Sequence, residues 1–140
     1  MRTKTERRSN RRFGMPDNFS TDFSDEDLYL LLTLGKKYGF DPLSSAECEK
    51  YFMNLLQKYD ESQGSKRSFL ENIISKSFIS CEEKPSWVQN ADWQFADGKP
   101  MFFVGQKEIA ITKNHIIFHY IFYIFWDMDT GNVKTIIQSE

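Results

Sequence analysis

Cysteine is scarce in this chain of 140 residues, and no long apolar run occurs. The two cysteines, Cys48 and Cys81, lie far apart and match neither a CxxC pair nor the spacing of zinc ligands, which predicts reduced thiols and a cytoplasmic protein. The longest apolar run, from His115 to Trp126, has about 12 residues, whereas a helix that crosses a membrane needs roughly 20. The residues that follow Arg12 do not form the apolar core of a secretion signal. We therefore expect neither a membrane segment nor export.

Motifs of nucleotide-binding enzymes and of enzymes with a serine nucleophile are also missing. Gly35, Gly39 and Gly64 form no phosphate-binding loop, and neither GxSxG nor SxxK occurs. Cys48 lies on the apolar stripe of an expected helix, where packing explains it better than a role as a nucleophile. The sequence therefore predicts no cofactor and favours a protein that is not an enzyme.

Charge is distributed unevenly along the chain. Residues 1–12 contain six Arg or Lys and only Glu6 as an acid, a net charge of 6 - 1 = +5, whereas the whole chain has -2. The remainder therefore has -2 - 5 = -7, an acidic body behind a basic arm. An acidic body disfavours nucleic acid as its main partner, so we expect nucleic acid to bind only through residues 1–12, if it binds at all.

The pattern of apolar residues predicts an α+β fold in which three helices pack on an antiparallel sheet that ends in a β-hairpin. Residues 1–23 lack apolar periodicity and are expected to be a disordered arm, and residues 24–140 a single domain. Helical spacing recurs through residues 25–78, and Ser24 and Gly39 are suitable caps for the first helix. With 13 Phe in the chain, the core can be large without disulfides or metals.

The strands are expected within residues 86–138, where apolar residues become β-branched or aromatic. Residues 101–106 and 107–112 read as two strands, and Lys113-Asn114 as a turn. Residues 115–126 would be a long strand with a bend near His119, and because both of its faces are apolar, we expect helices or loops to cover both. The turn residues between Asp127 and Asn132 predict a closing hairpin.

Four residues are weak candidates for metal ligands. His115 and His119 are separated by four positions, which would place them on one face of a strand or helix, and the same pair is the basis for an alternative function as a metal-dependent or acid/base enzyme. Asp127 and Asp129 resemble the start of a calcium loop. The histidines lack a third ligand at a recognisable spacing, and the calcium-like loop has its glycine at the fifth position and Gln138, not Glu, at the twelfth, so we predict no metal site.

Two tryptophans in a loop-like stretch have two interpretations. Trp87 and Trp93 either pin the loop to the sheet or form a recognition surface together with Lys99 and Gln106. Pinning is the simpler account, and recognition makes these four residues the candidate binding residues.

The same stretch resembles a known family. PSWVQNADWQFADGKPMFFVGQ at residues 85–106 and FYIFWDMDTGNVKTIIQ at residues 122–138 resemble the YwqG-like family of uncharacterised bacterial proteins. That resemblance implies a small cytoplasmic bacterial protein, and similar short domains occur as immunity proteins of toxin systems. The matching positions are Trp93, Gly98, Lys99, Pro100, Met101, Phe103, Val104, Gln106, Phe122, Phe125 and Trp126.

Taken together, these patterns predict a non-catalytic protein-binding domain. In its specific form the hypothesis is an immunity-type inhibitor whose acidic body meets a basic bacterial toxin through complementary charge. An enzyme that uses His115 and His119, and a nucleic-acid accessory protein that acts through the basic arm, are the two alternatives. The sequence leaves the oligomeric state open.

Overall fold

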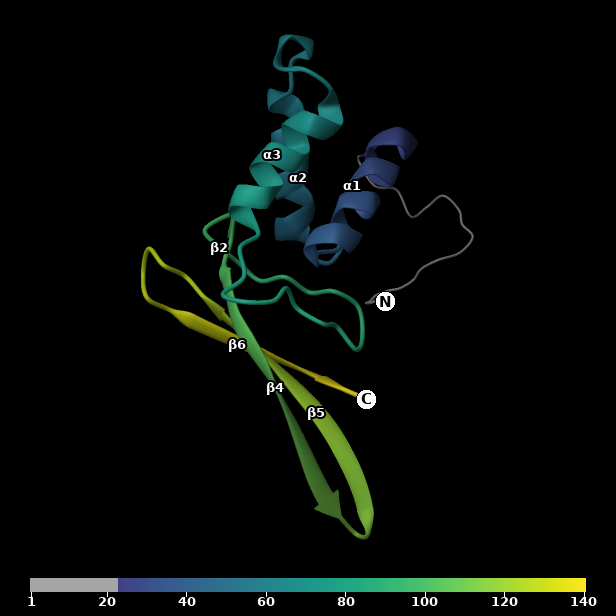
Figure 1. The fold of residues 1–140 in the computed structure, drawn as a ribbon, viewed down its shortest axis with the longest axis vertical. Coiled ribbons are helices and arrows are strands. Elements are labelled where there is room, and N and C mark those ends of the chain that lie inside the picture. The colour runs from purple at the N-terminus through teal and green to yellow at the C-terminus, as the bar shows by residue number, and fades with distance from the viewer. Residues whose placement is uncertain (1–22) are drawn as a thin grey trace.

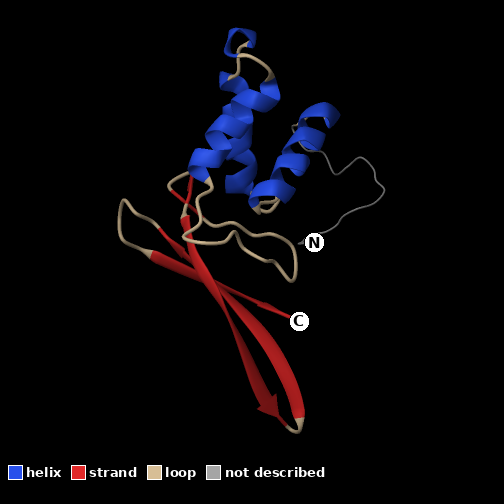
Figure 2. Cartoon of the chain, in the orientation of Figure 1, coloured by secondary structure: helices blue, strands red, loops and turns tan. Residues whose placement is uncertain are grey.

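A computed structural model describes residues 23–140, and it confirms the predicted α+β fold with the helices first and the antiparallel sheets after them (Figures 1 and 2). The arm predicted for residues 1–23 lies outside this range except for Phe23, which is buried in the core. Among residues 23–140, no helix is both long and apolar enough to cross a membrane.

The helices are α1 (Asp25–Tyr38), α2 (Ala46–Lys58) and α3 (Lys66–Ser77), with the short 3-10 helix η1 (Glu61–Gln63) between the last two. A serine side chain accepts a hydrogen bond from the first turn of each α-helix, which satisfies a backbone donor that the helix leaves free. Ser24, Ser45 and Ser65 cap α1, α2 and α3. Gly39 ends α1 in the left-handed conformation, as predicted.

The main sheet has the order β4-β5-β6, with β4 (Phe102–Lys113), β5 (Ile116–Trp126) and β6 (Val133–Ser139) all antiparallel. The predicted division of residues 101–112 into two strands is wrong, because β4 is continuous through them. The sheet irregularity lies in β4 between Phe103 and Gly105, not near His119. Asn114 and His115 both have positive φ, which closes the β4–β5 hairpin in a two-residue turn.

A second, small sheet pairs β2 (Phe95–Ala96) with β3 (Lys99–Pro100) just before β4. Asp97 and Gly98 form the turn between them, both with positive φ. Aromatic rings fill the space between the helices and the start of the main sheet. Trp93 contacts Phe78 from the helical side and Phe125 from the sheet, with ring centroids 5.2 and 5.5 Å apart, so one core joins the two halves.

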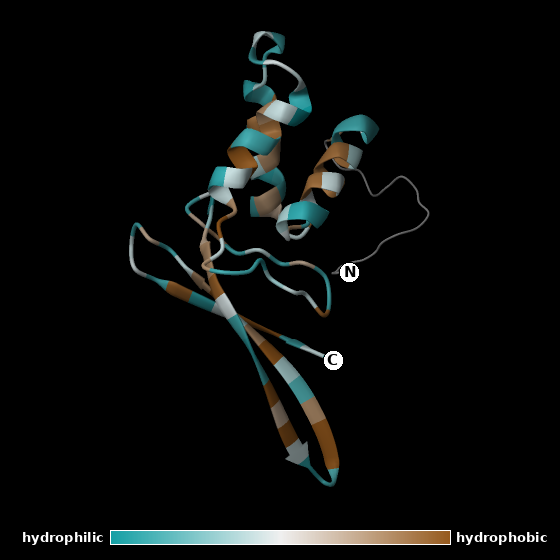
Figure 3. Cartoon of the chain, in the orientation of Figure 1, coloured by the Kyte–Doolittle hydropathy of each residue, from teal (hydrophilic) through white to brown (hydrophobic). Residues whose placement is uncertain are grey.

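The β4–β5 hairpin is much longer than the part of it that the core uses. It extends away from the helices as a two-stranded arm, with the helices near one end only (Figure 1). Brown, apolar bands continue along this arm to its tip (Figure 3). The expectation that both faces of residues 115–126 are covered is therefore wrong within the described part of the chain, because only Ile121, Tyr123 and Phe125 are buried along β5.

Candidate protein-binding surface

One face of the main sheet carries mostly apolar side chains, with Lys107 and Lys113 as its charged residues. In antiparallel strands, residues opposite each other point to the same face, and the pairs Ile111–Phe118, Ile109–Tyr120 and Phe122–Ile137 therefore share one face. We call this the uncovered face. Side chains on one face of a strand come from alternate residues. The apolar residues of the uncovered face on β4, β5 and β6 are Phe102, Ile109, Ile111, Ile116, Phe118, Tyr120, Phe122, Ile124, Trp126, Val133 and Ile137.

Near the helices, exposure differs sharply between the two faces of the sheet, whereas both faces are exposed at the hairpin tip. Ile116, Val133 and Ile137 on the uncovered face are 56%, 60% and 55% exposed. On the opposite face Tyr123 and Phe125 are fully buried beneath the rest of the domain. No element of residues 23–140 packs over the uncovered face closely enough to bury these side chains. Contiguous exposed apolar surface of this kind is typical of interaction sites.

The loops and strands opposite the uncovered face are held by specific hydrogen bonds. Gln138, the one buried polar residue of the described core, accepts hydrogen bonds at Oε1 from the backbone N–H groups of Val88 and Gln89, at 3.1 and 3.0 Å. Its Nε2 donates to the carbonyl of Asn90 at 2.8 Å. Buried polar groups of this kind fix one arrangement of a loop. One side of the sheet is therefore held to the loop by these hydrogen bonds, whereas the other side, the uncovered face, is exposed to solvent.

The four candidate binding residues from the sequence do not form one site. Trp93 is 1% exposed and its indole N–H donates to the carbonyl of Met101 at 2.8 Å. Trp87 donates to the carbonyl of Gly39 and stacks on Tyr123, with ring centroids 4.4 Å apart. Through these contacts, both tryptophans hold the loop against the helices and the sheet.

The other two residues lie apart. Gln106 exchanges hydrogen bonds with the backbone of Ser86, at 2.8 and 3.3 Å, and so also holds the loop. Lys99 is exposed and points toward Asp129, with 3.6 Å between the ammonium and the carboxylate. Of the four, Lys99 is the one whose charged group, paired with Asp129, is on the surface.

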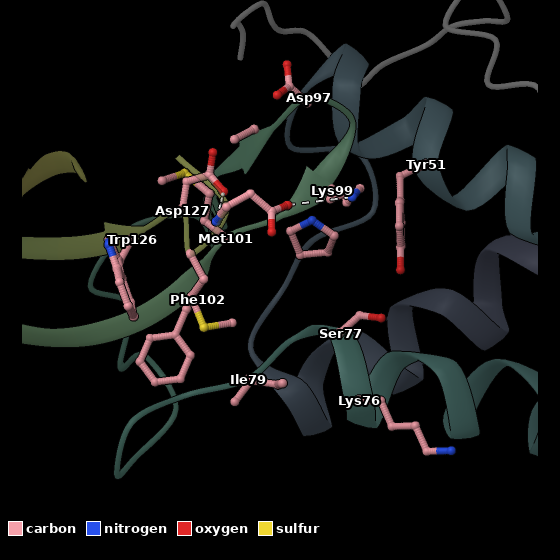
Figure 4. Close-up of a pocket in the computed structure, with 14 residues that line it drawn as sticks. Tyr51, Lys76, Ser77, Ile79, Asp97, Lys99, Met101, Phe102, Trp126 and Asp127 are labelled. Carbon is pink, nitrogen blue, oxygen red and sulfur yellow. Dashed lines mark hydrogen bonds and ion pairs between the residues drawn. The ribbon is translucent and has the colours of Figure 1, made fainter. Parts of the chain in front are cut away.

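Lys99 and Asp129 line an open pocket of about 350 Å³ between the end of α3, the β2–β3 turn and the β5–β6 loop (Figure 4). Asp127 lies at its edge, but its side chain is used within the loop, where it accepts hydrogen bonds from Thr130 and from the backbone of Asp129. These bonds lower the pKa of Asp127. The carboxylate of Asp127 thus holds the turn, whereas that of Asp129 faces Lys99, and Trp126 and Phe102 of the uncovered face also line the pocket.

The two histidines are also placed differently from each other. His115 is in the tight turn of the hairpin. His119 lies on β5, on the face opposite the uncovered one, with its Nδ1 3.2 Å from a carboxylate oxygen of Glu108. Glu140 lies close to both, and one ligand atom from each of the three falls within 4.8 Å of the others. The acid/base or metal role of His115 and His119 stays a prediction.

Sequence reasoning missed a pair of carboxylates between the helices and the loop. Burial raises the pKa of Asp41 and of Asp92, and the charge of Asp41 raises the pKa of Asp92 further. Asp41 accepts a hydrogen bond from the backbone of Leu43 at 2.9 Å. The nearby thiol of Cys48 is buried, and its pKa is raised to about 12, so it stays protonated. No spacing rule connects Asp41 with Asp92, which are far apart in the chain.

This carboxylate pair predicts that the protein becomes less stable as pH rises. A carboxyl whose pKa is higher in the folded state than in the unfolded state favours folding when protonated, and this contribution is lost as pH rises through the folded pKa. Asp92→Asn removes one of the charges, so we expect a higher Tm than wild type at pH 7 and a difference that shrinks toward pH 4. Thermal unfolding followed by circular dichroism at both pH values measures this.

The exposed Asp97 supplies the control for that experiment. It has a positive φ that asparagine also tolerates, so Asp97→Asn should leave Tm unchanged at both pH values. An Asp92→Asn variant that is no more stable than wild type at pH 7 would show that the two carboxylates do not oppose folding.

Comparison of the chain with protein-family models, with curated proteins and with solved structures gave no match.

Proposed function

We propose that this chain is a non-catalytic protein-binding domain and that the uncovered face is its contact surface. The observation that carries the proposal is the set of apolar side chains exposed on one face of β4, β5 and β6. The three strands have 12, 11 and 7 residues, which at about 3.4 Å per residue and about 4.8 Å between strands gives a face of about 500 Å². This is within the size range of the largest apolar patch on a monomer, which is often a functional one.

Apolar area of this size favours association. Removing apolar surface from water contributes roughly 25 cal/mol for each Å², so about 500 Å² gives at most about 12 kcal/mol before the cost of ordering two molecules, because the face also carries Lys107 and Lys113. The rigid support behind the face lowers that cost, because Gln138 and Tyr123 fix the opposite side of the sheet to the loop. A preformed apolar surface of this kind is therefore suited to bind another protein.

The specific form of the proposal is an immunity-type inhibitor of a bacterial toxin. Its support is electrostatic: residues 23–140 contain 12 Lys or Arg and 17 Asp or Glu, a net charge of 12 - 17 = -5, which favours a basic partner. Membership of the YwqG-like family is proposed on the motif from Trp93 to Gln106 and the aromatic strand that follows it.

The test uses two adjacent isoleucines on opposite faces of the same strand. Ile116 lies on the uncovered face and Ile117 on the other, and they are 56% and 59% exposed. The tagged chain is co-expressed with an untagged copy and with the proteins encoded beside its gene, and captured proteins are identified by mass spectrometry. We expect Ile116→Glu to reduce the captured protein at least tenfold, because a buried carboxylate without a partner opposes the contact.

Ile117→Glu is the matched control, since it adds the same charge at the same end of the hairpin. It should capture as much protein as wild type. Equal capture by both variants, or no specific capture by the wild-type chain, would contradict the proposal that this face binds protein.

A further inference from the structure

We infer that the protein that packs on the uncovered face is a second copy of this chain, in a symmetric dimer with the two sheets face to face. This inference rests on the general form of the proposed function, a protein contact on the uncovered face, and it places a second copy of the chain there instead of a basic toxin. A two-fold interface brings the same patch of both molecules together, so the patch must complement itself in shape, polarity and charge. The uncovered face meets each of these conditions.

The shape and polarity of the face fit a copy of itself. Sheets that pack face to face keep their strands within about 30° of each other and fill the space between them with side chains from both inner faces. The uncovered face offers β-branched and aromatic side chains on three adjacent strands. Two such faces bury roughly 1,000 Å² in total, which reaches the lower limit for a specific interface.

The charges at the two ends of the face complement each other when one copy is turned end over end. Lys113 lies on the uncovered face at the hairpin tip. Asp127 and Asp129 lie at the other end, in the loop between β5 and β6. A two-fold axis that runs across the strands between the sheets reverses their direction, and so brings the tip of each copy against the loop end of the other. Lys113 of each copy then lies toward the loop end of its mate, where Asp127 and Asp129 outnumber Lys99, the partner of Asp129, and leave a net negative charge.

The middle of the face does not oppose this arrangement. Lys107 is the only charged residue of the strands near the centre of the uncovered face, opposite Phe122. It belongs to β4, an outer strand of the sheet, so its aliphatic stem can run over the sheet edge and keep the ammonium in water. The central contact is then formed by Phe122 and Ile137 of both copies.

Sedimentation equilibrium of the purified chain tests the inference directly. From roughly 1 to 500 µM, a range that brackets micromolar association, we expect a reversible dimer. Ile116→Glu should raise the dimer dissociation constant at least a hundredfold, and Ile117→Glu should change it less than threefold. A wild-type chain that is monomeric throughout, or a dimer that Ile116→Glu leaves intact, would overturn the inference.

Charge exchange tests the end-over-end arrangement. Lys113→Glu and Asp129→Lys should each weaken the dimer about tenfold, because each converts two attractive contacts into repulsive ones. An equimolar mixture of the two variants should form a heterodimer that is tighter than either variant's homodimer, since position 113 of each copy then faces the opposite charge at position 129 of its mate. Failure of the mixture to associate better than either variant alone would overturn this arrangement.

The two experiments distinguish an error in the proposed function from an error in the dimer inference. If the purified chain is monomeric but Ile116→Glu still abolishes capture of a protein encoded beside its gene, the face binds a different protein and only the dimer is wrong. If nothing binds the face in either experiment, both are wrong. Circular dichroism of each variant confirms that it is folded, which the exposure of Ile116, Lys113 and Asp129 leads us to expect.

Discussion

Trp93→Ala is expected to lower the free energy of unfolding by about 3–5 kcal/mol, the range for truncating a fully buried large aromatic side chain. The indole is 1% exposed and contacts Phe78, Phe103 and Phe125. Its loss opens a cavity between the helices and the sheet and leaves the carbonyl of Met101 without its donor. Denaturation by urea, followed by tryptophan fluorescence and circular dichroism, measures the change.

The same substitution at Trp126 is the control. Trp126 is exposed on the uncovered face, where it contacts Phe102 with ring centroids 6.2 Å apart. Trp126→Ala should cost about 1 kcal/mol or less in the monomer. Equal losses for the two variants would mean that Trp93 does not join the two halves of the core.

Gly35→Ala is expected to destabilise the protein by about 2–3 kcal/mol, although alanine in the interior of a helix normally stabilises it by about 1 kcal/mol relative to glycine. A Cβ at Gly35 would lie 2.4 Å from the carbonyl oxygen of Phe40. This oxygen belongs to the backbone directly after α1, and the carbonyl of Gly35 itself accepts hydrogen bonds from Gly39 and Phe40. The chain must therefore shift at the point where α1 meets the core.

Gly105→Ala provides the comparison for this backbone effect. A methyl group added at Gly105 would meet no other atom within 4 Å, and the residue has no positive φ, so the alanine should change the free energy of unfolding by less than about 0.5 kcal/mol. Urea denaturation of both variants separates the two cases. A Gly35→Ala variant as stable as wild type would show that the end of α1 adjusts freely.

The helices were predictable because their signals are local. Ser24 caps α1 and Gly39 ends it, and the apolar residues of α2, among them the buried Cys48, Phe52 and Leu55, recur at the spacing of one stripe. The β5–β6 hairpin was predictable for the same reason, since Asp127 to Asn132 form a turn by hydrogen bonds among neighbours. A single sequence is enough to predict an element wherever the groups that stabilise it lie close together in the chain.

The candidate binding surface could not be predicted in this way. Residues 115–126 are apolar on both faces, and their sequence does not say which face the helices cover. Only the tertiary position of Tyr123 and Phe125 beneath the loop decides this. The pairing of Gln138 with Val88 and the proximity of Asp41 to Asp92 likewise join segments about 50 residues apart, for which one sequence has no signal.

The outer strand β4 has a consequence for how this protein behaves when concentrated. From Lys107 to Lys113 its backbone pairs with β5 on one side, and on the other side it faces no strand of residues 23–140. An open row of amides and carbonyls is a template for fibrils. A lysine at each end of this row, together with the kink between Phe103 and Gly105, discourages further strands from adding there, so the domain should remain free of amyloid at concentrations at which a flat, uncharged strand would polymerise.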